Sequence, residues 1–132
     1  LGPELRKIHK KFGSEIPTPH SQLHLYPISG AAGEVGNDKT AWANREAKYA
    51  GVCVGVDGSP ENAEKITNWC KNYWEALHPF ATGAAYINFM MDEGEDRIKA
   101  SYRNNYDRLV RVKNEYDPEN FFRVNQNIKP EP

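Results

Sequence analysis

The stretch YAGVCVGVDGSPENAEKITNWCKNYWEAL, residues 49–77, joins a strand to a helix and decides the fold class. Valine at positions 52, 54 and 56 predicts a strand over residues 49–56. The other face of this strand carries the small residues Gly51, Cys53 and Gly55. Side chains this small allow a helix, or alternatively a ligand, to approach the backbone closely. The run Ser59-Pro60-Glu61 predicts a helix start with the serine hydroxyl as its cap. Apolar residues at helical spacing extend this helix to about Leu77, so we expect it to pack on the sheet.

The segments before this stretch predict one more helix and one more strand. Leu5, Ile8 and Phe12 stand at helical spacing within residues 1–15, which are otherwise basic. The run SQLHLYPI, residues 21–28, has the composition of a strand that ends at a proline. We therefore expect a helix and a strand to precede the central stretch.

Two further short strands and a long helix are expected in the rest of the chain. The strands are Thr40–Asn44, which includes Trp42, and AAYINFM, residues 84–90. Acidic residues crowd positions 92–96 and predict the first turn of a helix, because carboxylates are favourable at a helix N-terminus. The expected apolar stripe of this helix, with Lys113 at its edge, is Ile98, Tyr102, Tyr106, Leu109, Lys113 and Tyr116.

The tail YDPENFFRVNQNIKP, residues 116–130, predicts a C-terminal strap. Asp117-Pro118 has the pattern of a helix N-cap, followed by a turn too short for a full helix. Phe121 and Phe122 are expected to anchor this turn by burial, and three carboxamides follow them. The chain therefore predicts an α+β fold, an antiparallel sheet with helices packed on one face, followed by a C-terminal strap.

Composition limits the classes of function. The 132 residues carry a net charge of −1, with 39% hydrophobic and 27% charged residues, as in an ordinary globular domain. Basic residues alternate with acidic ones, which argues against nucleic acid as a partner. No apolar run is long enough for a membrane span. Cys53 and Cys70 are too few for a disulfide framework, and we expect both to be buried thiols.

Searches for common catalytic and metal-binding patterns give nothing specific. No nucleophile-elbow motif surrounds any serine that could join His24 and Asp57 in a triad. His20 and His24 are four residues apart in an extended segment, where this spacing does not bring two ligands to one ion. The acidic residues 92–96 are better explained as a solvated helix start. We expect no metal site and assign no catalytic residue.

Tyr86 and Asn88 form the most informative pair. In a strand they point to the same face, where an aromatic ring and a carboxamide suit the edge of a planar heterocycle such as flavin. Burial of Tyr86 in the core, with Asn88 as a satisfied strand amide, is the alternative from these two residues alone.

Four motifs together resemble the berberine-bridge-enzyme-like FAD-linked oxidoreductases. They are TAWANREAKYA at 40–50, ATGAAYINFM at 81–90, RLVRVKNEYDP at 108–118 and the tail at 116–130. The resemblance implies that residues 1–132 are a single domain, the C-terminal part of a longer enzyme with part of its substrate domain. FAD is the implied cofactor, with most of its site in an N-terminal domain that this chain lacks.

The resemblance also implies roles for particular residues. Tyr86, Asn88, Asn125 and Asn127 would approach the flavin, and Trp42 and Phe89 would line the substrate pocket. The enzyme would oxidise a small organic substrate by hydride transfer to flavin, with dioxygen or another electron acceptor. Many plant members have a tyrosine as catalytic base at the site of Phe89, which has no proton to exchange. The rival interpretation is a free-standing, non-enzymatic α+β binding or interaction module.

Overall fold

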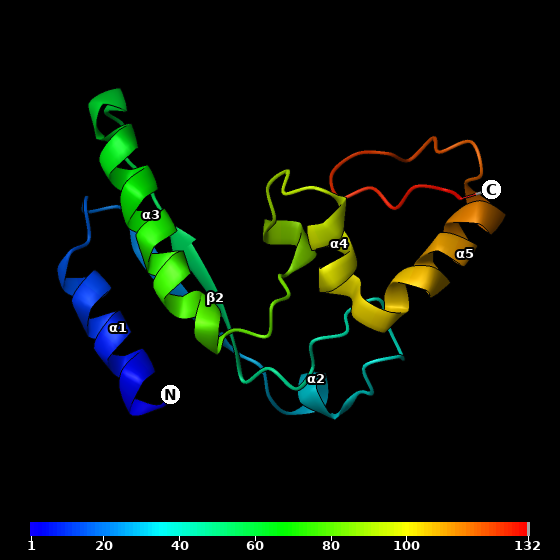
Figure 1. The fold of residues 1–132 in the computed structure, drawn as a ribbon, viewed down its shortest axis with the longest axis horizontal. Coiled ribbons are helices and arrows are strands. Elements are labelled where there is room, and N and C mark those ends of the chain that lie inside the picture. Colours follow the sequence, from blue (N-terminus) through cyan, green and yellow to red (C-terminus); the bar gives the residue numbers. More distant parts are fainter. Residues whose placement is uncertain (132) are drawn as a thin grey trace. The chain divides into compact units, whose positions relative to one another are not determined.

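A computed structural model describes residues 1–131, which form two compact units (Figure 1). Unit 1 consists of Leu1–Pro27 and Tyr49–Ala81, and unit 2 consists of Ile28–Lys48 and the chain from Thr82 onward. No helix formed by residues 1–131 is long and apolar enough to cross a membrane. Each unit is described separately below.

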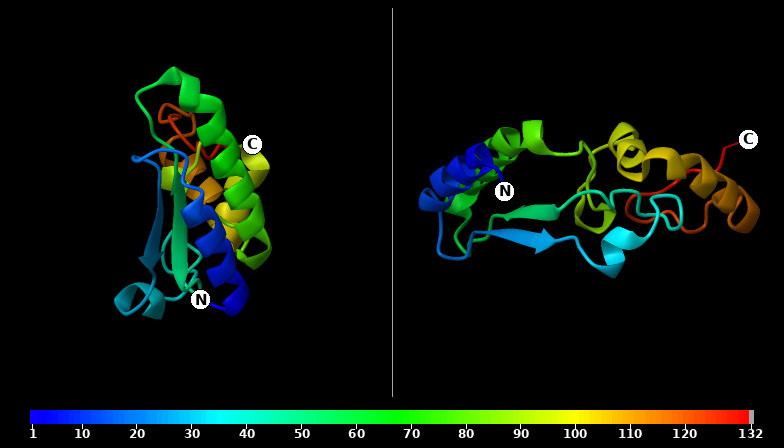
Figure 2. Two further views of the ribbon diagram at one scale, coloured as in Figure 1. Left: turned by 90° about the vertical axis from the view of Figure 1, so that its left-hand side faces the viewer. Right: turned by 90° about the horizontal axis from the view of Figure 1, so that it is seen from below.

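Unit 1 is a two-stranded sheet covered by two helices. Helix α1 (Pro3–Ser14) precedes strand β1 (Gln22–Pro27), and strand β2 (Tyr49–Val54) precedes helix α3 (Ala63–Leu77). The strands pair antiparallel, and Figure 2 shows both helices over the same face of the sheet. The register runs from Gln22 opposite Val54 to Pro27 opposite Tyr49. The predicted α+β class is confirmed, with a sheet of two strands in the described chain.

Aromatic side chains from the two helices form the core of unit 1. The ring of Phe12 stacks on that of Tyr73 at 4.5 Å between centroids, and Trp69 meets Tyr73 edge-on at 5.4 Å. Polar atoms of these rings have partners: Trp69 Nε1 donates to the Phe12 carbonyl at 3.0 Å, and Tyr73 Oη bonds His9 Nδ1 at 2.7 Å. The helical spacing of α1 and α3 identified Phe12 and Tyr73 as core residues but did not identify Trp69.

Close helix packing, rather than a ligand, explains the small residues beside β2. A Cβ atom added at Gly55 would lie 2.1 Å from Ile66 Cγ2 and 3.0 Å from Cys70 Sγ, both on α3. Cys53 and Cys70 are free thiols that pack against the aromatic cluster. Burial raises the pKa of Cys53 to about 11, so the thiol stays protonated and behaves as a small apolar group.

The start of α3 differs from the prediction. A short 3-10 turn, η1 (Pro60–Asn62), precedes the helix, and the Ser59 hydroxyl makes no capping hydrogen bond. Instead, the Asp57 carboxylate accepts from the backbone N–H of Ser59 at 2.8 Å and from Asn62 Nδ2 at 3.1 Å. Because an ionised carboxylate is the stronger acceptor, it replaces the hydroxyl in this turn.

Unit 2 is helical, and both of its predicted strands are absent. It contains α2 (Ala31–Glu34), the 3-10 turn η3 (Ile87–Phe89), α4 (Glu95–Tyr102), η4 (Arg103–Asn105) and α5 (Tyr106–Tyr116). The region predicted as the strand Thr40–Asn44 forms bends, and residues 84–90 contain η3. A strand needs a hydrogen-bonded neighbour, and within residues 1–131 only β1 and β2 pair.

The long helix predicted after the acidic cluster is broken. Arg103 has φ +51°, which ends α4, and its guanidinium pairs with the carboxylate of Glu46. The resulting bend changes which residues of α4 and α5 share a face. Tyr116, which was predicted to belong to the apolar stripe, is therefore largely exposed. Lys113 is not at the edge of the stripe either, because it pairs with Asp117 and both side chains are only 12% exposed.

The strap at residues 117–131 follows α5, but its aromatic residues are not buried. Asp117 ends α5 and starts no helix, although its carboxylate accepts from the backbone N–H groups of Phe121 and Phe122 at 2.7 and 3.0 Å. The two rings meet edge-on and are 78% and 75% exposed. Their predicted role as buried anchors within this chain is therefore wrong.

Candidate functional site

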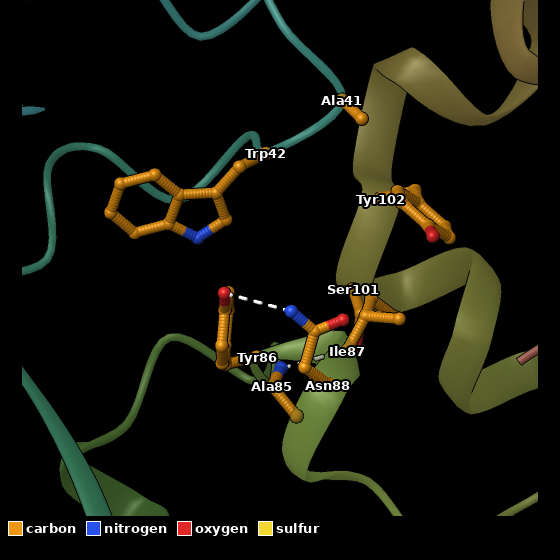
Figure 3. Close-up of a pocket in the computed structure, with 8 residues that line it drawn as sticks. All are labelled: Ala41, Trp42, Ala85, Tyr86, Ile87, Asn88, Ser101 and Tyr102. Atoms are coloured by element: carbon orange, nitrogen blue, oxygen red, sulfur yellow. Dashed lines mark hydrogen bonds between the residues drawn. The ribbon is translucent and has the colours of Figure 1, made fainter. Parts of the chain in front are cut away.

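Unit 2 contains a half-open pocket of about 150 Å³ (Figure 3). Its walls come from a loop before β2, from the segment around η3 and from the last turn of α4. The lining residues are Ala41, Trp42, Ala85, Tyr86, Ile87, Asn88, Ser101 and Tyr102. Three of the residues singled out from the sequence, Trp42, Tyr86 and Asn88, thus meet at one place.

Tyr86 and Asn88 lie side by side, although no strand holds them. Asn88 Nδ2 donates a hydrogen bond of 2.9 Å to Tyr86 Oη (Figure 3). Tyr86 is extended, and the chain then turns tightly, with the Phe89 N–H donating to the Tyr86 carbonyl at 2.9 Å. Asn88 therefore folds back toward Tyr86 through a 3-10 turn, which produces the neighbour relation that a strand was expected to produce.

Two buried amides hold the loop that carries Trp42: Asn105, which ends η4, and Asn44, which lies on the loop itself. Asn105 Nδ2 donates to the carbonyls of Asn37 and Thr40 at 2.7 and 2.9 Å. Asn44 Nδ2 donates to the Ser101 carbonyl at 3.0 Å. Neither amide stood out in the sequence, since asparagine usually indicates a solvated surface.

Ser101 and Arg45 complete this framework. Ser101 Oγ accepts from the Ala85 N–H at 3.1 Å and donates to the Arg97 carbonyl at 2.9 Å, so it fixes the start of the segment that bears Tyr86. The guanidinium of Arg45 lies 5.0 Å from the Trp42 ring centroid. This distance is within the range of a cation–π contact, which orients the indole.

Phe89, predicted to line the substrate pocket, is not among the lining residues. Its ring packs edge-on against Tyr86 at 5.1 Å and is more than half exposed. The contact supports the Tyr86 ring from outside the pocket. The predicted part of Phe89 in substrate binding stays a prediction.

The tail amides lie near the segment around η3 without lining the pocket. Asn125 is exposed with φ +61°, and the Asn127 N–H donates to its carbonyl at 2.9 Å in a tight turn. The amide between them holds the tail: Gln126 Nε2 donates to the carbonyls of Met90 and Met91 at 3.1 and 2.8 Å. Gln126 is thus the tether, a role that the sequence did not single out among three adjacent carboxamides.

The aromatic, amide and hydroxyl side chains that line the pocket suit a neutral planar group. None of the eight lining residues is an acid, a histidine or a basic residue. Burial raises the pKa of Tyr102, so its phenol stays protonated near neutral pH. Residues 1–131 contain no group of three or more histidine, cysteine or acidic side chains that could hold a metal ion.

The pocket is smaller than a usual ligand pocket, which indicates that it is one part of a larger site. Ligand pockets usually have volumes of about 300–1,000 Å³, whereas this pocket measures about 150 Å³. The Tyr86 hydroxyl and the Asn88 amide match the alternating donors and acceptors at one edge of a flavin ring. The residues present therefore fit one edge of such a cofactor and not the whole of it.

Comparison with known proteins agrees with these features. Residues 85–129, which include Tyr86, Asn88 and most of the strap, match the family model described as berberine and berberine like. The chain is 32% identical over 121 residues to the FAD-linked oxidoreductase YgaK of Bacillus subtilis, with 92% of this chain and 27% of that protein covered. It is 30% identical over 136 residues to berberine bridge enzyme-like 24 of Arabidopsis thaliana, with 90% and 21% covered.

A solved structure supports the same relation. A variant of BBE-like 1 from Physcomitrella patens superposes with a TM-score of 0.67 at 26% identity, and the match covers 83% of this chain and 24% of that chain. The chain thus spans about a quarter of the length of these relatives. Residues 85–129 thus match the berberine and berberine-like family, and the chain is similar over most of its length to part of the FAD-linked oxidoreductases related to that family.

Proposed function

We propose that this chain is the C-terminal portion of a longer FAD-dependent oxidoreductase that oxidises a small organic substrate. The carrying observation is the hydrogen-bonded pair of Tyr86 and Asn88, which faces a pocket with Trp42 inside the berberine-like segment. A flavin held beside Tyr86 and Asn88 would supply the hydride acceptor, with dioxygen or another electron acceptor as the second substrate. The rest of the cofactor site would lie in the part of the relatives that this chain does not match.

Asn88 and Tyr86 orient the cofactor edge in this proposal. Because the Tyr86 oxygen accepts from Asn88 Nδ2, the phenolic hydrogen is directed to a second acceptor. The Asn88 carbonyl oxygen remains available as an acceptor. The pair therefore offers a donor and an acceptor on neighbouring positions, which suits a ring carbonyl next to a ring N–H.

Trp42 and Tyr102 act as walls. The indole of Trp42 lies opposite the hydroxyl end of Tyr86 (Figure 3), where its apolar face excludes water from the pair. Burial raises the pKa of the Tyr102 phenol, which therefore keeps its own proton near neutral pH. Phe89 carries no exchangeable proton, so neither residue is proposed as the catalytic base.

Replacing Asn88 in the longer protein tests the proposal. Asn88→Ala removes the hydrogen bond and leaves the flavin edge unpaired, which we expect to weaken flavin retention by about 1–3 kcal/mol. Flavin content after gel filtration and the rate of flavin reduction are the measurements. Asn72→Ala, which removes an exposed amide on α3 of unit 1, is the matched control and should change neither.

The chain by itself provides a second test, which also addresses the rival non-enzymatic module. We expect FAD to bind the isolated chain weakly or not at all, since only one edge of the site is present. Submicromolar affinity in a flavin-fluorescence titration would contradict this expectation. A reading frame that starts immediately before Leu1 would favour the free-standing module and end the proposal of an FAD-dependent oxidoreductase.

A further inference from the structure

Three polar side chains share the face of the unit 1 sheet that α1 and α3 leave uncovered. Leu23 of β1 and Cys53 of β2 pack against the aromatic core, on the face that both helices cover (Figure 2). Because side chains alternate along a strand, Gln22, His24 and Tyr26 of β1 project from the opposite face. Within unit 1 these polar groups therefore serve no core.

Hydrogen bonds join the three side chains in one direction. Gln22 Nε2 donates to the His20 carbonyl at 3.4 Å, and Gln22 Oε1 lies 2.7 Å from His24 Nε2. Because a carboxamide oxygen only accepts, His24 Nε2 carries the hydrogen of the neutral imidazole. His24 Nδ1 is then the acceptor, and Tyr26 Oη donates to it at 3.0 Å. The chain of hydrogen bonds thus fixes the tautomer of the imidazole.

This arrangement prepares the Tyr26 oxygen to accept a proton. A phenol oxygen that donates its hydrogen still carries two lone pairs. When a proton arrives at Tyr26 Oη, the phenolic hydrogen can move to His24 Nδ1, and Gln22 Oε1 then accepts from the imidazolium that forms. A reactive oxygen, a base behind it and a third group that orients the base are the parts of an activated catalytic hydroxyl.

Strand β2 places small apolar side chains beside this pair. Ala50 lies opposite Tyr26 in the register, Val52 opposite His24 and Val54 opposite Gln22. Among the paired residues of this face, His24 and Tyr26 are the titratable groups, and β2 contributes none. Within this paired face, therefore, no carboxylate competes with Tyr26 for the imidazole. The short side chain of Ala50 leaves room for a ligand beside the phenol.

We propose that Tyr26, with His24 behind it, is the general base of the oxidation. This inference rests on the proposed function and assigns an alcohol as the class of substrate. Oxidation of an alcohol to a carbonyl compound removes a hydride from carbon, which passes to the flavin, and a proton from the hydroxyl group, which passes to Tyr26 Oη. The phenolic hydrogen moves to His24 Nδ1, and the imidazolium later releases a proton to solvent. Tyr26 touches the substrate, whereas His24 acts through Tyr26.

Flavin reduction in the longer protein tests the assignment. Benzyl alcohol, 1-hexanol and glucose are the probes, and stopped-flow absorbance of the flavin is the measurement. Tyr26→Phe keeps the ring and removes the oxygen, so we expect the rate of reduction to fall by about 10²–10⁴-fold with unchanged flavin content. Tyr49→Phe, which alters another half-exposed tyrosine of the sheet, is the matched control and should keep the rate.

His24→Gln distinguishes proton transfer from a structural role. Glutamine can accept a hydrogen bond from Tyr26 but cannot take its proton at neutral pH. The rate of reduction in this variant should rise by about tenfold per pH unit, because hydroxide takes over the role of the base. The unaltered protein should lose rate only in acid, where a protonated His24 cannot accept the phenolic hydrogen. Equal loss of rate at every pH in His24→Gln would overturn the relay.

The outcomes separate this inference from the proposed function. In the isolated chain, ¹⁵N NMR should show His24 protonated at Nε2 and not at Nδ1 above neutral pH. The opposite tautomer overturns the base without reference to flavin. A flavin-loaded protein that none of the three alcohols reduces, or that they reduce equally fast in Tyr26→Phe, overturns the base alone. Absence of bound flavin in the longer protein overturns both proposals.

Discussion

Unit 1 has an aromatic core, whereas unit 2 buries smaller apolar side chains, such as Ile98 and Val110, beside two asparagines and a serine. In unit 1 the largest buried side chains are the aromatic rings of Phe12, Trp69 and Tyr73, which pack on one another. In unit 2 the buried side chains include Asn105 and Ser101, which hold loop and segment backbones by directed hydrogen bonds. Burial of apolar area tolerates small shifts, whereas a hydrogen bond requires a partner at a defined distance and angle.

Directed hydrogen bonds can hold irregular segments in place, and the candidate site lies among such segments. The pocket residues Trp42 and Tyr86 come from irregular segments of unit 2, which buried polar groups position individually. Unit 1, in contrast, consists mainly of helices packed on a sheet. Three substitutions and one change of pH test this contrast, in order of decreasing cost in stability.

Removing the central ring of unit 1 should have the largest effect. Tyr73 is 1% exposed, so Tyr73→Ala should lower the free energy of unfolding by about 3–5 kcal/mol through lost burial and a cavity. Tyr73→Phe keeps the stack with Phe12 and loses only the bond to His9, at about 1 kcal/mol. Urea unfolding measures both. Equal losses in the two variants would mean that the hydrogen bond, and not packing, stabilises unit 1.

Adding one methyl group at the sheet–helix contact should have the next effect. Gly55→Ala places a Cβ 2.1 Å from Ile66 Cγ2, and such overpacking costs about 1–3 kcal/mol. Gly58→Ala is the matched control, since no atom lies within 4 Å of its added Cβ. Thermal melts compare the two. A neutral Gly55→Ala would show that α3 and β2 can separate without loss of stability.

Removing a buried amide should disturb unit 2 and spare unit 1. Asn105→Ala leaves the carbonyls of Asn37 and Thr40 without their donor, at an expected loss of about 1–3 kcal/mol. The NMR signal of the Trp42 indole should shift or broaden, while that of Trp69 should not. Asn104→Ala, an exposed neighbour, is the control. Identical changes at both indoles would contradict independent stabilisation of the units.

Acid should release the strap with the smallest effect on the whole chain. The Lys113 ammonium and the N–H groups of Phe121 and Phe122 lower the pKa of Asp117 from its ordinary 3.8. A carboxyl with a lowered pKa in the folded state stabilises the fold above the unfolded value, and this contribution disappears as pH falls through the folded value. The strap should thus stay clamped at neutral pH and open below about pH 3.8.

Amide chemical shifts of Phe121 and Phe122 followed during acidification measure the opening. Asp117→Asn removes the charge, so its shifts should be insensitive to acid and resemble those of the opened strap. Acid-independent shifts in the unaltered chain would show that groups other than Asp117 hold the strap.

The regular elements of unit 1 could be predicted from local patterns. The spacing of Leu5, Ile8 and Phe12 identified α1, and alternating valines identified β2. The small face of that strand correctly indicated close helix packing, now seen at Gly55. These predictions succeeded because helix and strand periodicity depends on neighbours along the chain. The pairing of Tyr86 with Asn88 was also predictable, although the turn that produces it was not.

The tertiary structure alone decided the remainder. Apolar composition suggested strands at Thr40–Asn44 and residues 84–90, but strand formation depends on a distant partner that local sequence does not specify. Asn105 and Gln126 look like surface amides until the backbone carbonyls they hold are known. Phe121 and Phe122 have the composition of buried anchors, yet Asp117 directs their backbone so that the rings face solvent. Sequence composition determines that a side chain favours burial, and only the folded backbone determines what is available to bury it.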